Sequence, residues 1–186
     1  ANLDSANLIG TNLHLADLTG ANLDSANLTL ANLHLADLTG ANLHLADLTE
    51  ANLSGVNLTR ANLSGVDLRD KDLTNTIFVG ANLSGSNLSG VNLSDKDLTG
   101  VNLSKAYLVG ADLGGVDLTS LDLSQIILGR THLTGVTMGF WQTIKTYRCY
   151  IEFPDEQMNL WGKLVKQIYA LFSDRGVCQS KWASSG

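Results

Sequence analysis

Residues 1–20 read ANLDSANLIGTNLHLADLTG, and residues 21–40 read ANLDSANLTLANLHLADLTG. Seventeen of these 20 positions are identical. Inside each stretch a shorter period of five is visible, because leucine stands at positions 3, 8, 13 and 18. A duplication that copies four five-residue units at once keeps any structure built from four such units in register. The sequence therefore predicts a structural repeat of four units.

The five-residue period continues through most of the chain. Leucine recurs at every fifth position from Leu3 to Leu133, and Phe78 is the one exception among those 27 positions. The residue before it is Asn or Asp in 23 units, and the residue two before it is mostly Ala or Val. A helix needs apolar residues three and four apart, and a strand needs alternation, so a period of five fits neither. The pattern predicts a very short extended segment and then a corner, with four units closing a square.

These units resemble those of the pentapeptide-repeat family, whose consensus is A-[DN]-L-x-x, and the resemblance covers residues 1–139. It implies an all-β solenoid, a right-handed quadrilateral β-helix of about seven 20-residue coils, with leucine pointing to the axis. Stacked coils of this kind place leucines that are four units apart in one buried column, and Phe78 occupies a leucine position. We expect the core to include Leu23, Leu43, Leu63, Phe78, Leu83 and Leu103.

The remaining segment, residues 140–186, has a different composition. Of the eleven aromatic residues in the chain, nine lie between Phe140 and Trp182. Helical spacing of apolar residues over about 155–173 predicts a C-terminal helix. Because solenoid ends need caps, we expect this segment to cover the last coil with Trp141, Trp161, Leu164, Ile168 and Phe172. No matching segment precedes Ala1, so we expect either that residues are missing from this chain or that the first coil meets another molecule, as in an end-to-end homodimer.

The two cysteines, Cys149 and Cys178, bracket the predicted helix. Two reduced thiols and a disulfide fit this spacing equally well. A disulfide would add a few kcal/mol of stability and would place the protein in a lumen, a periplasm or the secreted fraction. Some lumenal pentapeptide-repeat proteins of photosynthetic organisms are similar in this respect. Reduced thiols would instead indicate the cytoplasm.

The charge distribution restricts the class of partner. Residues 1–140 carry 14 acidic and 6 basic side chains, net −8, whereas the remaining 46 residues carry 4 and 6, net +2. An acidic chain without a basic patch is not expected to bind nucleic acid directly. No run of 18 apolar residues is present, so we expect no membrane span. Aspartates recur on one predicted face and form a candidate acidic interaction face: Asp17, Asp37, Asp97 and Asp117.

Candidates for chemistry are few. His14 and His34 fall one coil apart on the same face, but the neighbouring Asn12, Asn32 and Ser54 offer no third metal ligand. An interior filled by leucine leaves no cleft for a substrate. We therefore expect no catalytic residue, no metal site and no cofactor. The Asn and Asp residues that precede each leucine are expected to be mainly structural. Their side chains bond to nearby backbone groups in turns, and stacked Asn amides add a ladder of hydrogen bonds.

Two lysines occupy the position two before the leucine, which is mostly Ala or Val in the other units. Lys71 and Lys96 stand where alanine or valine should point inward, each between two aspartates. An unpaired buried lysine is costly, so we expect each side chain to leave through the corner, or the backbone to bulge. A partner-docking spot on the acidic surface is the alternative.

The predicted function is non-catalytic. The first hypothesis is a structural or interaction protein that presents rigid faces to a protein partner. The alternative, which the family resemblance implies, is a DNA-mimicking protein that binds a DNA-acting enzyme such as gyrase, because an acidic rod of duplex-like width can occupy a basic groove.

Overall fold

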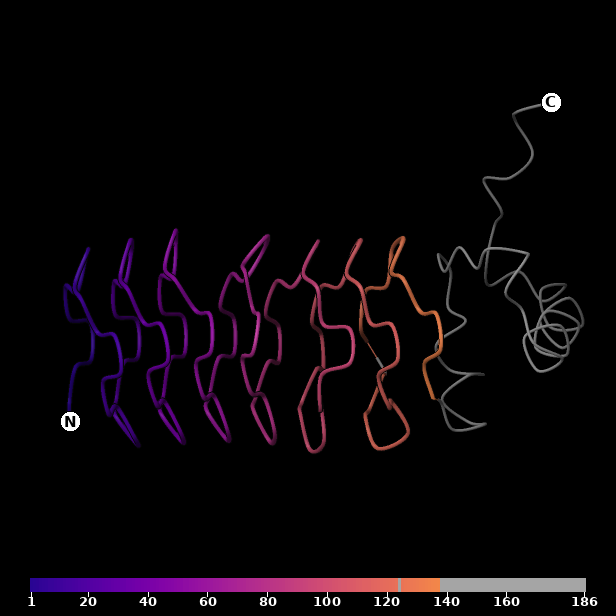
Figure 1. Ribbon diagram of the computed structural model, residues 1–186, viewed down its shortest axis with the longest axis horizontal. Helices are drawn as coiled ribbons and strands as arrows, with labels where there is room; N and C mark the ends of the chain where they lie inside the picture. Colours follow the sequence, from indigo (N-terminus) through magenta and orange to yellow (C-terminus); the bar gives the residue numbers. More distant parts are fainter. Residues whose placement is uncertain (124, 138–186) are drawn as a thin grey trace, which may run out of the picture.

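The computed structural model describes residues 1–123 and 125–137, in which the chain winds as a stack of similar coils around one axis (Figure 1). Residues 20 apart in sequence lie side by side and run parallel, beginning with Asn2 beside Asn22 and Asn7 beside Asn27. We number the coils from the N-terminus, so that coil 1 is 1–20 and coil 2 is 21–40. Faces 1 to 4 of coil 1 contain Asn2, Asn7, Asn12 and Asp17 in that order. The predicted four-unit repeat is the repeat of the structure.

Over the described part of the chain, the pairing consists of isolated bridges, with no helix and no continuous strand. At most one residue of each described unit is bridged and the next turn begins two residues later, so a face is too short for a longer strand. The bridge is nevertheless complete: Leu23 N donates to Asn42 O at 2.7 Å, and Asn42 N donates to Ala21 O at 2.9 Å. None of the residues described forms a helix long and apolar enough to cross a membrane.

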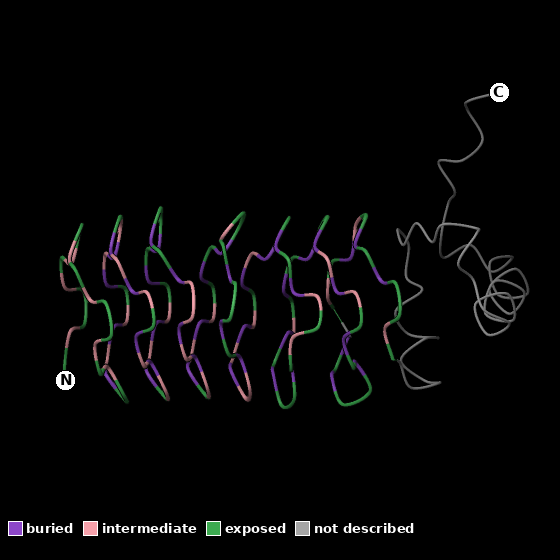
Figure 2. Cartoon of the chain, viewed as in Figure 1, coloured by how far each residue is buried: buried purple, intermediate pink, exposed green. Residues whose placement is uncertain are grey.

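Buried residues recur in successive coils along the stack (Figure 2), and their mostly aliphatic side chains make up the core. Leu23, Leu43, Leu63 and Leu83 are 0% exposed, and Phe78 and Leu103 are 1% and 2% exposed. The alanines and valines beside them are also buried, for example Ala61 at 0%. Fully burying a leucine is worth about 1.5–3 kcal/mol, so this core is the main source of stability. Every buried side-chain N or O atom in the part described has a hydrogen-bond partner.

Each corner requires one residue in the left-handed conformation. The second residue after the central leucine has positive φ in almost every unit, and glycine fills many of these sites, such as Gly10 at φ 62° and Gly65 at φ 72°. Non-glycine residues occupy 14 others. A left-handed backbone costs an ordinary L-residue about 1–2 kcal/mol, so the corners hold strain wherever glycine is absent.

The ladder of bridges is interrupted at three corners. Within the described ranges, six pairs 20 apart in sequence are not bridged: 47–67, 52–72, 72–92, 77–97, 97–117 and 102–122. Each pair has a member close in sequence to Lys71, Lys96 or Leu121, where lysine or leucine replaces the usual alanine or valine. Lys71 and Lys96 are half-buried, whereas alanines at equivalent positions are buried. The bridges are therefore missing where lysine or leucine occupies this position.

Some predictions concern residues outside the described ranges. The C-terminal helix, its capping residues Trp141, Trp161, Leu164, Ile168 and Phe172, and the pair Cys149 and Cys178 all lie there. The end-to-end homodimer and the boundary between 1–139 and 140–186 stay predictions.

Candidate protein-binding surfaces

The Asn/Asp residue of each unit holds its own turn. Its Oδ1 accepts the backbone N–H of the residue two positions later, as from Thr39 to Asp37 at 2.8 Å and from Ser94 to Asn92 at 2.8 Å. Where the acceptor is a carboxylate, these bonds favour the charged form. The hydroxyl and then the N–H of Thr19 lower the pKa of Asp17, and those of Thr99 lower the pKa of Asp97. These turn aspartates are therefore held ionised on the surface.

Face 1 carries an unbroken ladder of amide side chains. Asn42 Nδ2 donates to Asn22 Oδ1 at 3.1 Å, Asn62 to Asn42 at 2.8 Å, and Asn82 to Asn62 at 2.9 Å. The same bond links Asn22 to Asn2 and Asn102 to Asn82. Each internal asparagine thus accepts the hydrogen bond of its own turn and also bonds to the asparagines of the two adjacent coils. These amides are engaged with one another, so we assign face 1 a structural role.

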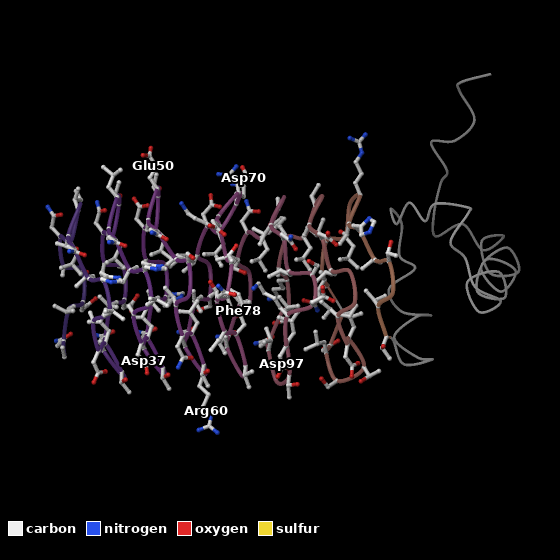
Figure 3. All side chains as sticks on the ribbon, viewed as in Figure 1. Asp37, Glu50, Arg60, Asp70, Phe78 and Asp97 are labelled. Atoms are coloured by element: carbon white, nitrogen blue, oxygen red, sulfur yellow. The ribbon has the colours of Figure 1, made fainter. Side chains whose placement is uncertain are left out.

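Face 4 carries the predicted acidic column. Asp17 and Asp37 are neighbours in coils 1 and 2 and are bridged. Asn57 and Ile77 follow in the next two coils, and Asp97 and Asp117 then form a second, unbridged pair. The structure therefore divides the four carboxylates into two pairs separated by two uncharged coils. Asp37 and Asp97 project from the same edge of the stack (Figure 3).

The two histidines on face 3 stack on each other. Their ring centroids are 5.3 Å apart and the planes differ by 6°. His14 Nδ1 lies 2.9 Å from the carbonyl oxygen of His34, and His34 Nδ1 lies 2.8 Å from that of Ser54. A carbonyl accepts only, so Nδ1 carries the proton and Nε2 is left for a ligand. The Nε2 lone pairs lie in the planes of two nearly parallel rings and so do not converge, whereas a chelated ion needs convergent nitrogens at about 2.0–2.1 Å. The described residues contain no group of three metal-binding side chains.

The exposed large hydrophobic side chains include two groups that the sequence analysis did not identify. The first stands at the corners of coils 1 to 3: Leu15, Leu30, Leu35 and Leu45 are 65%, 55%, 47% and 57% exposed. The second lies on face 2 of later coils, where Tyr107 is bridged to Ile127 and Val109 lies nearby, all between 41% and 46% exposed. These leucines fall on the variable x positions of the A-[DN]-L-x-x consensus. The first group could therefore have been found only by aligning successive coils and comparing the residues at the same corner.

The charge of the rod is also uneven along its length. Residues 1–59 contain Asp4, Asp17, Asp24, Asp37, Asp47 and Glu50 and no lysine or arginine, which is a net charge of −6. Arg60 is the first basic residue. Residues 60–140 contain eight acidic and six basic side chains, net −2. The first three coils are therefore both the most acidic part of the rod and the part with exposed leucines.

The sequence profile of the family described as Pentapeptide repeats matches this chain in eight copies, over residues 1–34, 16–55, 26–65, 57–95 and 97–135. Together these matches cover nearly all of the described residues. No individual curated protein matches the chain significantly.

Solved structures of pentapeptide repeat proteins are similar to the chain. HetL, involved in heterocyst differentiation regulation in the cyanobacterium Nostoc, is 32% identical over 74% of this chain and 59% of its own, with a TM-score of 0.33. This chain thus matches less than two thirds of the length of HetL. A trypsin-treated form of QnrB1, a plasmid-mediated fluoroquinolone resistance protein, is 23% identical over 81% and 73%, with a TM-score of 0.38. A protein of the Arabidopsis thaliana thylakoid lumen is 20% identical over 96% and 84%, with a TM-score of 0.19.

Proposed function

This chain belongs to the pentapeptide-repeat family, and we propose that it is a non-catalytic interaction protein whose rigid faces bind a protein partner. The observation that carries the proposal is a contrast between interior and surface. The interior is filled by aliphatic side chains, whereas each face carries side chains of its own kind. From Leu23 to Leu68 the central leucines are 0–2% exposed and fill the axis, and the buried polar side chains are Thr76, Ser86 and Thr131 among the residues described. Each face, in contrast, presents a regular column of amides, carboxylates or aliphatic groups.

Rigidity favours this role. Backbone bridges hold the columns at the spacing of paired strands, about 4.8 Å, so a partner meets a surface that loses little conformational entropy on binding. Interaction surfaces commonly combine exposed aliphatic groups with a charged rim, and the first three coils have both.

Photo-crosslinking tests the proposal. We expect the folded protein, carrying a crosslinker on face 2 or face 3, to capture a discrete protein from a lysate of its source organism. A Leu63→Asp variant, in which the core is disrupted, should capture nothing specific. Recovery of the same set of proteins by both forms, or of none by the folded form, would refute the proposal.

The second candidate function is that of a DNA mimic, which would bind a DNA-acting enzyme such as gyrase in place of DNA. The acidic column of face 4 favours it, with Asp17 beside Asp37 and Asp97 beside Asp117. Charge density argues against it. Net −8 over about 34 Å of stacked coils is one charge per roughly 4 Å, whereas duplex DNA carries one per about 1.7 Å.

A supercoiling assay separates the two candidates. A mimic should alter gyrase activity, and replacement of the four face-4 aspartates by asparagine should abolish the effect, because asparagine preserves the turns but not the charge. Unchanged supercoiling at a high micromolar excess of protein would remove this candidate.

A further inference from the structure

Tyr107, Val109 and Ile127 form one apolar patch on face 2 of coils 6 and 7, the last coils described (Figure 1). Tyr107 and Ile127 are bridged, so their backbones lie side by side and their exposed side chains leave the same face. A Cβ atom added to Gly129 would lie 3.5 Å from both Cγ atoms of Val109, so the Val109 side chain is within van der Waals range of coil 7. The three side chains therefore belong to a single surface that spans two neighbouring coils.

This patch replaces side chains that hold the turn in every earlier coil. In coils 1 to 5 the same position of face 2 is Asn or Asp, and each Oδ1 accepts the backbone N–H two residues later at 2.9–3.2 Å: Asn7, Asn27, Asp47, Asp67 and Asn87. Tyr107 and Ile127 have no oxygen that can make this bond. Packing of tyrosine beside isoleucine recovers part of the loss, but both side chains remain nearly half exposed. A segment that covers them would account for the replacement.

The charged side chains beside the patch are both basic. Lys105 stands at the corner before face 2 in coil 6, and Arg130 stands at the corner after face 2 in coil 7. Residues 103–111 and 125–131, which form this face and its two corners, contain no Asp or Glu. Within the described ranges Arg69 pairs with Asp67, and neither Lys105 nor Arg130 has an anionic partner. A complementary occupant brings apolar groups together with carboxylates.

One later segment of the same chain combines these two properties. Residues 150–156 read YIEFPDE, in which an aliphatic and two aromatic side chains stand among three carboxylates. The rest of residues 138–186 contains six basic side chains and a single acidic one, Asp174. Residues 150–156 are thus the part of this segment that matches an apolar patch with a basic rim.

Residues 150–156 are also close enough in sequence to reach the patch. The last residue described, Thr137, lies on face 4 of coil 7 and is bridged to Asp117. The chain uses ten residues to pass round two corners from Ile127 to Thr137, and Tyr150 follows 13 residues after Thr137. That length is sufficient for the chain to return to face 2 of the same coil.

We propose that residues 150–156 dock on the apolar patch of the same chain. Their aromatic and aliphatic side chains cover the patch, and their carboxylates meet Lys105 and Arg130. A second copy of the chain is a poorer occupant, because a two-fold contact through the patch brings the same cations toward each other. The proposal concerns the C-terminal coils and is independent of the proposed function, which the acidic first coils support.

A photoreactive residue in the patch of the full-length protein tests this contact. Tyr107 is replaced by p-benzoylphenylalanine, which keeps an aromatic ring at this position. Trypsin cleaves after lysine and arginine, so residues 106–130 and 149–163 each form one peptide. We expect mass spectrometry to find these two peptides joined, with the linkage inside 150–156. The control places the same photoreactive residue at Ile77, which is as exposed as Tyr107 but lies on face 4 of coil 4, and should give no such linkage.

A mixture of unlabelled and isotope-labelled protein identifies the chain that supplies the segment. Joined peptides that carry the same label support the proposal. Pairs of mixed label would overturn it in favour of a contact between two copies. Absence of the linkage, or linkage of residues 106–130 to a foreign protein instead, would overturn it as well.

Hydrogen exchange of the intact protein provides a second measurement. Tyr107→Asn with Ile127→Asn restores the side chain that face 2 carries in other coils, so the rod should stay folded. We expect amide exchange in residues 150–156 to become about tenfold faster, which corresponds to about 1.4 kcal/mol at 25 °C. Ile77→Asn is the matched control and should leave that exchange unchanged. Equal exchange in the double variant and the wild type would contradict docking on this patch.

Charge reversal separates the rim from the apolar contact. Lys105→Glu with Arg130→Glu should also speed exchange in residues 150–156, because carboxylates then face carboxylates. Addition of Glu152→Lys with Asp155→Lys should slow it again, which a general loss of stability would not do. Failure of this rescue would show that the rim does not select the segment, and the proposed pairing would fall.

Discussion

At the scale of single residues, Asn62 shows how much one amide can do. Its Oδ1 accepts the N–H of Ser64 at 3.2 Å and the Nδ2 of Asn82 at 2.9 Å, and its own Nδ2 donates to Asn42 at 2.8 Å. We expect Asn62→Ala to lower the free energy of unfolding by about 1–3 kcal/mol, because the half-buried partners lose hydrogen bonds. Urea denaturation measures this.

The control for that variant is Asn52→Ala. Asn52 is exposed and accepts the N–H of Ser54 at 3.0 Å, but it lies on face 3 and takes no part in the amide ladder of face 1. We expect it to cost clearly less than Asn62→Ala. Equal losses would mean that the turn bond, and not the ladder, carries the effect.

Acid should destabilise the rod through its turn aspartates. Threonines two positions later lower the pKa of these carboxyls by hydrogen bonding, below the ordinary value of 3.8: Asp17, Asp47, Asp72, Asp97 and Asp117. A depressed folded pKa stabilises the fold above the unfolded pKa, and this contribution is lost as pH falls through the folded pKa. We expect the free energy of unfolding to decline below about pH 4.

Replacing these five aspartates by asparagine tests the cause. Asparagine accepts the same turn bond, as many units show, but does not titrate. The variant should lose less stability than the wild type between about pH 5 and pH 2, as followed by thermal melting. Parallel acid curves for the two proteins would assign the pH dependence to other groups.

The sequence was sufficient to predict the amide ladder but not the exposed leucines. The ladder follows from the period, because identical amides at the same place in successive coils must stack once four units close a coil. The leucines at 30, 35 and 45 fall on the two variable positions of the unit, which the family pattern leaves open. Their exposure depends on which residue lies in the next coil, and that relation becomes visible only when coils are superposed.

At the scale of a coil, the identity of the inward small residue correlates with whether neighbouring coils pair. All six interruptions of the ladder lie beside Lys71, Lys96 or Leu121, which are five units apart and therefore move round the rod by one corner each time. The sequence predicted that each lysine either leaves through the corner or makes the backbone bulge, since an ammonium group resists burial. It did not indicate how far the bridges would open, because that depends on both adjacent coils.

Shortening one of these side chains should restore pairing. Burial lowers the pKa of Lys96, against the opposite influence of Asp72, so this ammonium is held in an unfavourable site. We expect Lys96→Ala to stabilise the protein by about 0.5–1.5 kcal/mol for each backbone hydrogen bond regained. Hydrogen exchange at Asp97 and Asn92 should slow.

Lys105→Ala is the control, because Lys105 stands at an outward corner and the next face is bridged on both sides, from Tyr107 to Asn87 and to Ile127, so exchange at Asp97 and Asn92 should be unchanged. If Lys71→Ala with Lys96→Ala leaves stability unaltered, the crowding explanation fails and a docking role for these charged sites gains support.

At the scale of the whole molecule, each coil is held by the coils on either side, so damage to the axis should spread. Leu63 is 0% exposed, and Leu63→Asp would bury a carboxylate without a partner. We expect loss of the folded structure by circular dichroism. Leu45→Asp places the same carboxylate at an exposed corner, where Asp70 and Asp95 already adopt positive φ, and should stay folded. A folded Leu63→Asp variant would contradict the register of the core.

The near identity of coils 1 and 2 has a consequence for how the chain can change in length. Excision of residues 21–40 would bring Gly20 to Ala41, and Asn2 would then meet Asn42 as it now meets Asn22. Leucine would still follow leucine along the axis, and the corner glycines would keep their places. Insertions and deletions of one coil are thus nearly neutral for folding, and the rod can lengthen or shorten in steps of about 4.8 Å. Evolution can in this way move the acidic coils nearer to or farther from any other site on the same rod.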